Sequence, residues 1–182
     1  MGKLLMVMIL IILLLVGCGT GEKGNAAAGL DEYLTEKRIE KRVGSLQKTG
    51  SGGTHVRIQA IEQLIDEYIL KAEAESQGLS VSYREIQETI EFQIGTAKKV
   101  QNKRFENDLK ALNLSIEEYY QDYAYSSIKG KLLENKLYDK VTVEAETPEQ
   151  EVEKWNEYKN ELIKDFRNKN DAKIENVIDG LK

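Results

Sequence analysis

The chain of 182 residues has few of the residues from which cross-links and active sites are usually built. It contains one cysteine, one histidine, one proline and one tryptophan. A single cysteine cannot form a disulfide within the chain, and metal centres need clusters of ligands that His55 alone does not supply. We interpret His55, which stands beside a glycine-rich stretch at the start of a helix, as a solvated or capping residue. We therefore expect no catalytic residue, no metal site and no cofactor, and hence no enzyme.

Positive charge is also in short supply. The 26 lysines and arginines are outnumbered by 31 aspartates and glutamates, which gives a formal net charge of −5. An acidic chain gains no general attraction to the phosphates of nucleic acid or to anionic lipid. We therefore expect no nucleic-acid partner.

The one long apolar run lies at the beginning of the sequence. Leu4–Val16 is uninterrupted, follows the positive charge of Lys3, and is well short of the ~20 residues that a transmembrane helix needs. No second stretch approaches spanning length. This pattern predicts that residues 1–17 are a signal peptide.

Cys18 closes that run and indicates which kind of signal it is. Leu15-Val16-Gly17-Cys18 reads as a lipobox: an apolar residue, a tolerant position, a small residue and then the cysteine. An ordinary secretory signal, which is the alternative, would more usually carry a small residue where Leu15 stands. The segment resembles a bacterial lipoprotein signal, which implies removal of residues 1–17 and a diacylglyceryl thioether on Cys18.

Lipidation would attach the chain to the membrane without crossing it. Two palmitate-type acyl chains give stable anchoring, because each buried methylene contributes roughly 0.8 kcal/mol. Residues 18–29 are small and polar with no apolar period, and we interpret them as a lipidated flexible tether. The predicted domain, residues 30–182, would then lie close to the extracytoplasmic face of the bacterial cell membrane.

The remaining sequence predicts an all-α domain, because it is rich in Glu, Lys, Leu, Ile and Ala and has almost no proline. Apolar residues recur at helical spacing, most strongly between Thr54 and Gln77. Val141–Val143 is the only strand-like segment. The expected helices cover residues 30–47, 54–77, 82 to about 95, 97–112, 115 to about 139, 147–166 and a short terminal segment at 174–181.

Local signals mark the ends of these helices. Gly78 is a natural C-cap, and Gly95 is expected to interrupt or end the helix in which it lies. Ser82 with Glu85, and Ser115 with Glu118, have the spacing of capping boxes. Thr147 followed by Pro148 predicts the start of the last long helix.

Two stretches in this order resemble the N-terminal chaperone region of the SurA/PrsA/trigger-factor group. Residues 60–85 read AIEQLIDEYILKAEAESQGLSVSYRE, and residues 109–120 read LKALNLSIEEYY, followed by a long helix and the valine-rich exit at 141–143. The resemblance covers roughly residues 55–165. It implies an open, cradle-like arrangement of long amphipathic helices that holds unfolded or partly folded secreted or envelope proteins.

The same group often carries a parvulin prolyl-isomerase domain after the valine-rich exit. That domain needs several strands and paired histidines, whereas the 39 residues after Val143 read as helical and contain no histidine. We therefore expect a chaperone or holdase without isomerase activity. The alternatives are a lipid-anchored helical adaptor that binds one specific cell-surface partner, and an accessory protein of an enzyme complex.

Tyrosine is the expected client-binding residue, since the three methionines all lie within the predicted signal peptide. Tyr119, Tyr120, Tyr123 and Tyr125 fall within two turns, more than one helix stripe can bury. We predict that part of this cluster lines a client-binding surface; the alternative is that these residues pack in the core between the long helices. The sequence does not indicate an oligomeric state.

Overall fold

The computed structural model describes residues 29–48, 55–100 and 102–181, and within them it contains helices and no strand. The predicted all-α fold is therefore confirmed. The predicted signal peptide, Cys18 and all of the predicted tether except Gly29 lie outside the described residues. The elements are α2 (Leu30–Tyr33), α3 (Glu36–Lys48), α4 (Val56–Ser76), α5 (Tyr83–Lys99), α6 (Lys103–Leu112), α7 (Ile116–Glu118), the π-helical segment η1 (Tyr119–Tyr123), α8 (Tyr125–Thr142) and α9 (Pro148–Gly180).

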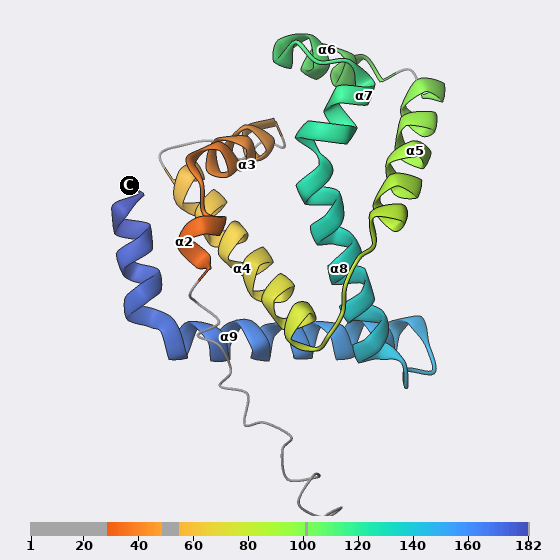
Figure 1. Ribbon diagram of the computed structural model, residues 1–182. Helices are drawn as coiled ribbons and strands as arrows, with labels where there is room; N and C mark the ends of the chain where they lie inside the picture. Colours follow the sequence, from red (N-terminus) through yellow and green to blue (C-terminus); the bar gives the residue numbers. More distant parts are fainter. Residues whose placement is uncertain (1–28, 49–54, 101, 182) are drawn as a thin grey trace, which may run out of the picture.

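The helices form an open cradle rather than a closed bundle (Figure 1). The first part of the long helix α9 runs along the base, and its C-terminal part turns away from the base at a kink. Helices α4 and α8 contact α9 and one another before diverging away from it. On one arm α3 packs on α4, and on the other α5 lies beside α8 with α6 across the far end. The expected open arrangement is thus confirmed.

The core is divided along the cradle into three apolar clusters. The largest joins α2, α3, α4 and α9, the second joins α4 to α8 below the point where they diverge, and the third lies between α5 and the start of α8. The predicted stripe of α4 is mostly buried: Ile61, Leu64, Ile65, Tyr68 and Ile69 are buried, whereas Ala72 is half-buried and Ile58 is exposed. Helix α4 contributes to the first two clusters and packs against α2, α3, α8 and α9, which makes it the central packing element of the fold.

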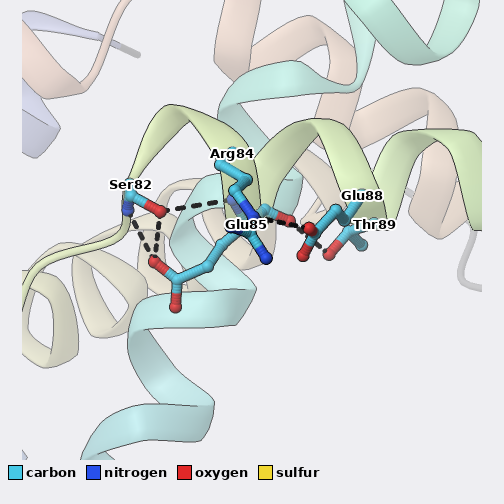
Figure 2. Close-up of polar contacts among 5 residues, drawn as sticks. All are labelled: Ser82, Arg84, Glu85, Glu88 and Thr89. Carbon is cyan, nitrogen blue, oxygen red and sulfur yellow. Dashed lines mark hydrogen bonds and ion pairs between the residues drawn. The ribbon is translucent and has the colours of Figure 1, made fainter.

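The predicted capping box at the start of α5 is present (Figure 2). The Ser82 hydroxyl accepts a hydrogen bond from the backbone N–H of Glu85 at 3.2 Å, and the Glu85 carboxylate accepts one from the backbone N–H of Ser82 at 2.8 Å. Glu85 also pairs with Lys136 of α8 at 2.5 Å. The hydrogen bonds from Lys136 and Ser82 lower the pKa of Glu85 from 4.5 to about 2.

This lowered pKa makes the α5 cap sensitive to acid. The unfolded chain takes up a proton at Glu85 near pH 4.5 and the folded chain only near pH 2, so the carboxylate's stabilisation is complete above pH 4.5 and is lost towards pH 2. We expect the difference in free energy of unfolding between wild type and Glu85→Gln to shrink over this interval. Urea unfolding at a series of pH values measures it; a difference that stays constant into strong acid would contradict the assignment.

The other predicted caps are also confirmed. Ser115 and Glu118 form the second capping box, and the Thr147 hydroxyl accepts a hydrogen bond from the backbone N–H of Gln150, with Pro148 as the first residue of α9. Gly78 follows α4 with a φ of +74°, the left-handed conformation that favours glycine. Local chemistry therefore determines where most of these helices begin and end.

Two predicted boundaries around α5 and α6 are wrong. Gly95 neither ends nor interrupts α5, which continues to Lys99; one glycine costs a helix only about 1 kcal/mol. The third helix starts later than expected, at Lys103, because the Asn102 side chain accepts hydrogen bonds from the backbone N–H groups of Arg104 and Phe105. The connection between α5 and α6 therefore lies further along the chain than the sequence predicts.

The helix expected over 115–139 is broken near its start. The three-residue α7 leads into η1, where the backbone N–H of Ala124 donates to the carbonyl of Tyr119 at 2.7 Å, the i to i+5 pattern of a π-helix. Regular α-helix resumes only at Tyr125. The tyrosines of this stretch are therefore rotated away from the positions that α-helical spacing predicts.

Of three further predicted segments, two differ from the structure and one agrees with it. The helix expected over 30–47 is split into α2 and α3 at Leu34 and Thr35. The strand-like Val141–Val143 is wrong as a strand, because α8 continues to Thr142, whose buried hydroxyl donates to the carbonyl of Tyr138 at 2.9 Å. The break predicted near the end of the last helix is confirmed as non-helical backbone at Asn170.

Candidate functional site

The described part of the chain offers neither a metal site nor a membrane span. In residues 29–48, 55–100 and 102–181, no three His, Cys, Asp or Glu side chains are placed so that they could hold a metal ion. None of the described helices is both long enough and apolar enough to cross a membrane. His55 lies exposed at the N-cap of α4, and its side chain makes no capping hydrogen bond, which agrees with the solvated interpretation.

Two hollows among the described residues are candidate binding sites, and η1 contributes side chains to both. The first, which we call the apolar hollow, lies between α5, α6 and η1 and has a volume of about 420 Å³. Its lining is mainly apolar, and its residues are Phe92, Gln93, Thr96, Ala97, Val100, Asn102, Phe105 and Tyr120. The second hollow lies between α3, α4 and α8 and is strongly charged.

Large apolar side chains at the apolar hollow are open to solvent. Phe92 is 75% exposed and Val100 is 56% exposed. Phe92 is exposed because Ile86 and Ile90 are on the buried face of α5, and a residue two positions after Ile90 points away from that face. Exposed apolar side chains at a concave surface are typical of sites that bind other molecules.

Aromatic rings form the inner wall of the apolar hollow. Phe105 of α6 packs edge-on against Tyr119 with ring centroids 5.1 Å apart, and its centroid lies 6.0 Å from that of Tyr120. Tyr119 and Tyr120 meet at 5.2 Å, also edge-on. Burial raises the pKa of both tyrosines, so their hydroxyl groups stay neutral at physiological pH. The wall is therefore aromatic and uncharged.

The four predicted client-binding tyrosines are half-buried, and they lie in different surroundings. Tyr119, Tyr120 and Tyr125 pack against the apolar cluster formed by Ile86, Ile90, Ala124 and Ile128. Tyr120 also lines the apolar hollow, whereas Tyr119 and Tyr123 line the charged one. These residues thus combine core contacts with exposed edges, and their role in client binding stays a prediction.

Sequence reasoning did not single out Phe92. The usable signal was the presence of a phenylalanine on the polar face of a helix whose apolar stripe is Ile86, Ile90 and Ile94. The helix that the sequence predicts over 97–112 would carry both Val100 and Phe105 on its apolar stripe. They instead lie on two sides of the α5–α6 connection and face a common hollow.

Comparison with known protein families identifies this architecture. The family model of the SurA-like N-terminal domain matches residues 2–133, which is well over half of the chain. The chain belongs to this family. The resemblance drawn from residues 60–85 and 109–143 is therefore confirmed, and the SurA-like N-terminal domain is a chaperone-related module.

The SurA-like match is placed differently from the predicted resemblance over 55–165. It begins earlier, covers α2–α7 and about half of α8, and stops before α9. The apolar hollow lies entirely inside the matched region. No curated protein and no solved structure matches the chain significantly.

Proposed function

We propose that this SurA-like protein is a holdase: it binds unfolded or partly folded secreted or envelope proteins at the extracytoplasmic face of the membrane, and it has no isomerase activity. The observation that carries the proposal is the apolar hollow, where the exposed side chains of Phe92 and Val100 stand next to the rings of Phe105 and Tyr120. Membership of the chaperone-related family supports it independently.

The chemistry of the apolar hollow suits clients of many sequences. Aromatic side chains present a large contact area and lose little conformational entropy on binding. An apolar side chain of a client that enters the hollow gains roughly 1.5–3 kcal/mol, less than the ~4.1 kcal/mol of a millimolar complex. One such contact is therefore weak and readily released, and firm holding needs several contacts along the cradle.

The predicted lipid on Cys18 would compensate for this weak binding by placing the protein where clients are concentrated. Cys18 lies outside the described residues, and its lipidation rests on the lipobox Leu15–Cys18. Attachment through a tether over residues 18–29 would hold the cradle near the membrane, where the local concentration of emerging clients is high. We therefore propose that the membrane is contacted through the lipid anchor only.

An aggregation assay tests the holdase proposal. The purified protein is added to a chemically unfolded model client, and light scattering is followed after dilution into buffer. We expect the protein to suppress scattering in a dose-dependent way, because clients with exposed apolar side chains occupy the hollow. An equal mass of serum albumin serves as the control for unspecific protection.

The opposite outcome would favour the adaptor. If the protein suppresses scattering no better than albumin but captures one folded protein stoichiometrically, the chain is a membrane-tethered adaptor and the holdase proposal fails. A prolyl-isomerase assay on a standard tetrapeptide belongs to the same test, and we expect no acceleration over the uncatalysed rate.

A further inference from the structure

The second hollow, which we call the charged groove, lies between the two arms of the cradle. It has a volume of about 690 Å³ and lies between α3 and α4 on one side and η1 and α8 on the other. Its lining is both polar and apolar, and three tyrosines contribute to it: Tyr33, Tyr119 and Tyr123. The groove has no residue in common with the apolar hollow.

The charge of this groove is opposite to that of the whole chain. Six cationic residues line it, against three acidic residues, Glu67, Asp122 and Glu134. The chain as a whole carries a formal net charge of −5. The positive lining residues are Lys37, Arg38, Lys41, Arg42, Lys71 and Lys131. A local positive excess inside a hollow of an acidic protein attracts anionic groups to that place.

Four of the cations lie together on α3, where they repel one another. Lys37 and Lys41, and likewise Arg38 and Arg42, are like-charge pairs at i and i+4, which destabilise a helix. Burial lowers the pKa of Lys41, and the neighbouring charges of Arg38, Arg42 and Lys37 lower it further. An anion bound between these side chains would relieve this repulsion.

The central cations are held in position by neutral groups. Arg38 lies over the ring of Tyr33, 4.1 Å from its centroid, and donates a hydrogen bond to the hydroxyl of Ser126 at 3.0 Å. Lys41 lies 4.0 Å from the ring centroid of Tyr123 and donates to that residue's carbonyl oxygen at 2.6 Å. These contacts orient the two positive groups between the arms without neutralising them. Of the other lining cations, Arg42 pairs with Glu67, Lys71 with Glu75, and Lys131 with Glu134.

We propose that the charged groove binds an extended acidic peptide segment, whose carboxylates pair with Lys37, Arg38 and Lys41. Aromatic side chains of the segment would pack beside Tyr33 and Tyr123. The groove would thereby add a charge-selective contact to the weak apolar one, although peptide binding there does not require that the protein act as a holdase. A discrete peptide fits better than a bilayer because the groove is concave. It can also place its carboxylates next to the cations and away from Glu67, Asp122 and Glu134.

Direct binding of a defined peptide tests this proposal. The probes are two short dye-labelled peptides, one alternating glutamate with tyrosine and the other alternating glutamine with tyrosine, and the readout is fluorescence anisotropy with the purified protein. We expect the glutamate peptide to bind more tightly and its affinity to fall as salt is raised from about 0.05 M to about 0.5 M. Equal affinity for both peptides would overturn the proposal.

A matched pair of substitutions assigns the binding to the groove. Lys37 is exposed, so Lys37→Glu should leave the fold intact, and we expect it to weaken the glutamate peptide about fivefold or more. Lys164→Glu changes the net charge equally at an exposed position of α9 outside the groove, and it should leave the affinity unchanged. Equal losses in both variants would show a general charge effect and overturn the assignment.

The same variants distinguish the peptide from a membrane surface. We expect binding to phosphatidylglycerol vesicles to be insensitive to Lys37→Glu. Vesicle binding that is lost in Lys37→Glu, kept in Lys164→Glu and not displaced by the glutamate peptide would assign the groove to anionic lipid instead. Failure of the holdase assay would leave these measurements unaffected, since they detect peptide binding without any aggregating client.

Discussion

Replacing Ile65 with alanine is expected to lower the free energy of unfolding by about 3 kcal/mol. Ile65 is fully buried on α4, inside the apolar cluster that joins α2, α3, α4 and α9. Removing three carbon atoms there loses the transfer free energy of the side chain, and it also leaves a cavity that four helices cannot easily fill. Because the base of the cradle depends on this cluster, the loss should destabilise the whole fold.

Ile58 provides the matched control on the same helix. It is 36% exposed, so Ile58→Ala should cost less than about 1 kcal/mol, and the higher helix propensity of alanine offsets part of that loss. Chemical denaturation followed by far-ultraviolet circular dichroism measures both variants. Similar costs for Ile65→Ala and Ile58→Ala would contradict the placement of α4 as the central packing element.

The double substitution Phe92→Ser/Val100→Ser is expected to remove most of the aggregation suppression and to leave the melting temperature nearly unchanged. The two side chains are 75% and 56% exposed, so the fold depends little on them. Phenylalanine and serine also have similar helix propensities. The loss would therefore come from the apolar hollow itself, which would keep Phe105 and Tyr120 but lose its two exposed apolar side chains.

A second double variant controls for the general loss of exposed apolar surface. Tyr83→Ser/Val152→Ser also removes one aromatic residue and one valine, which are 70% and 53% exposed, from positions outside the hollow. This variant should retain full activity in the light-scattering assay. If both double variants lose activity equally, clients bind to exposed apolar residues in general and the hollow is not a defined site.

The sequence predicted the packing of single helices well, because the relevant signals are local. The stripe of α4 follows from a three- and four-residue spacing that places apolar side chains on one side of a helix, and most of that stripe is buried. The capping boxes at Ser82 and Ser115 form because a hydroxyl and a carboxylate three residues apart accept hydrogen bonds from backbone N–H groups at the start of a helix. The family resemblance rested on the order of these same signals and is confirmed.

The candidate sites could not be predicted in the same way, because they depend on how distant segments meet. The apolar hollow requires Phe92 and Phe105 to lie on opposite sides of the α5–α6 connection. The prediction placed that connection too early, because it took Gly95 as the end of the helix. The π-helical segment also has no clear local signal, yet it determines that Tyr120 lies at one hollow and Tyr123 at the other.

The charged groove is a still more distant arrangement. Its cations on α3 are evident from the sequence, but charged residues on a single helix usually indicate a solvent-exposed face. Only the packing of α3 on α4, with Tyr123 and Ser126 opposite, places Arg38 and Lys41 inside a concave site. The negative net charge of the whole chain also gives no indication of a local positive site.

Site-specific photo-crosslinking tests the central claim most directly. A benzophenone amino acid is introduced at position 92 of α5, or at the similarly exposed position 83 of the same helix, and each protein is irradiated with an unfolded client and with the same client folded. The account predicts strong crosslinks from position 92 to the unfolded client, and few from position 83 or to the folded client. Equal crosslinking from both positions, or none from position 92, would contradict a client-binding site at the apolar hollow.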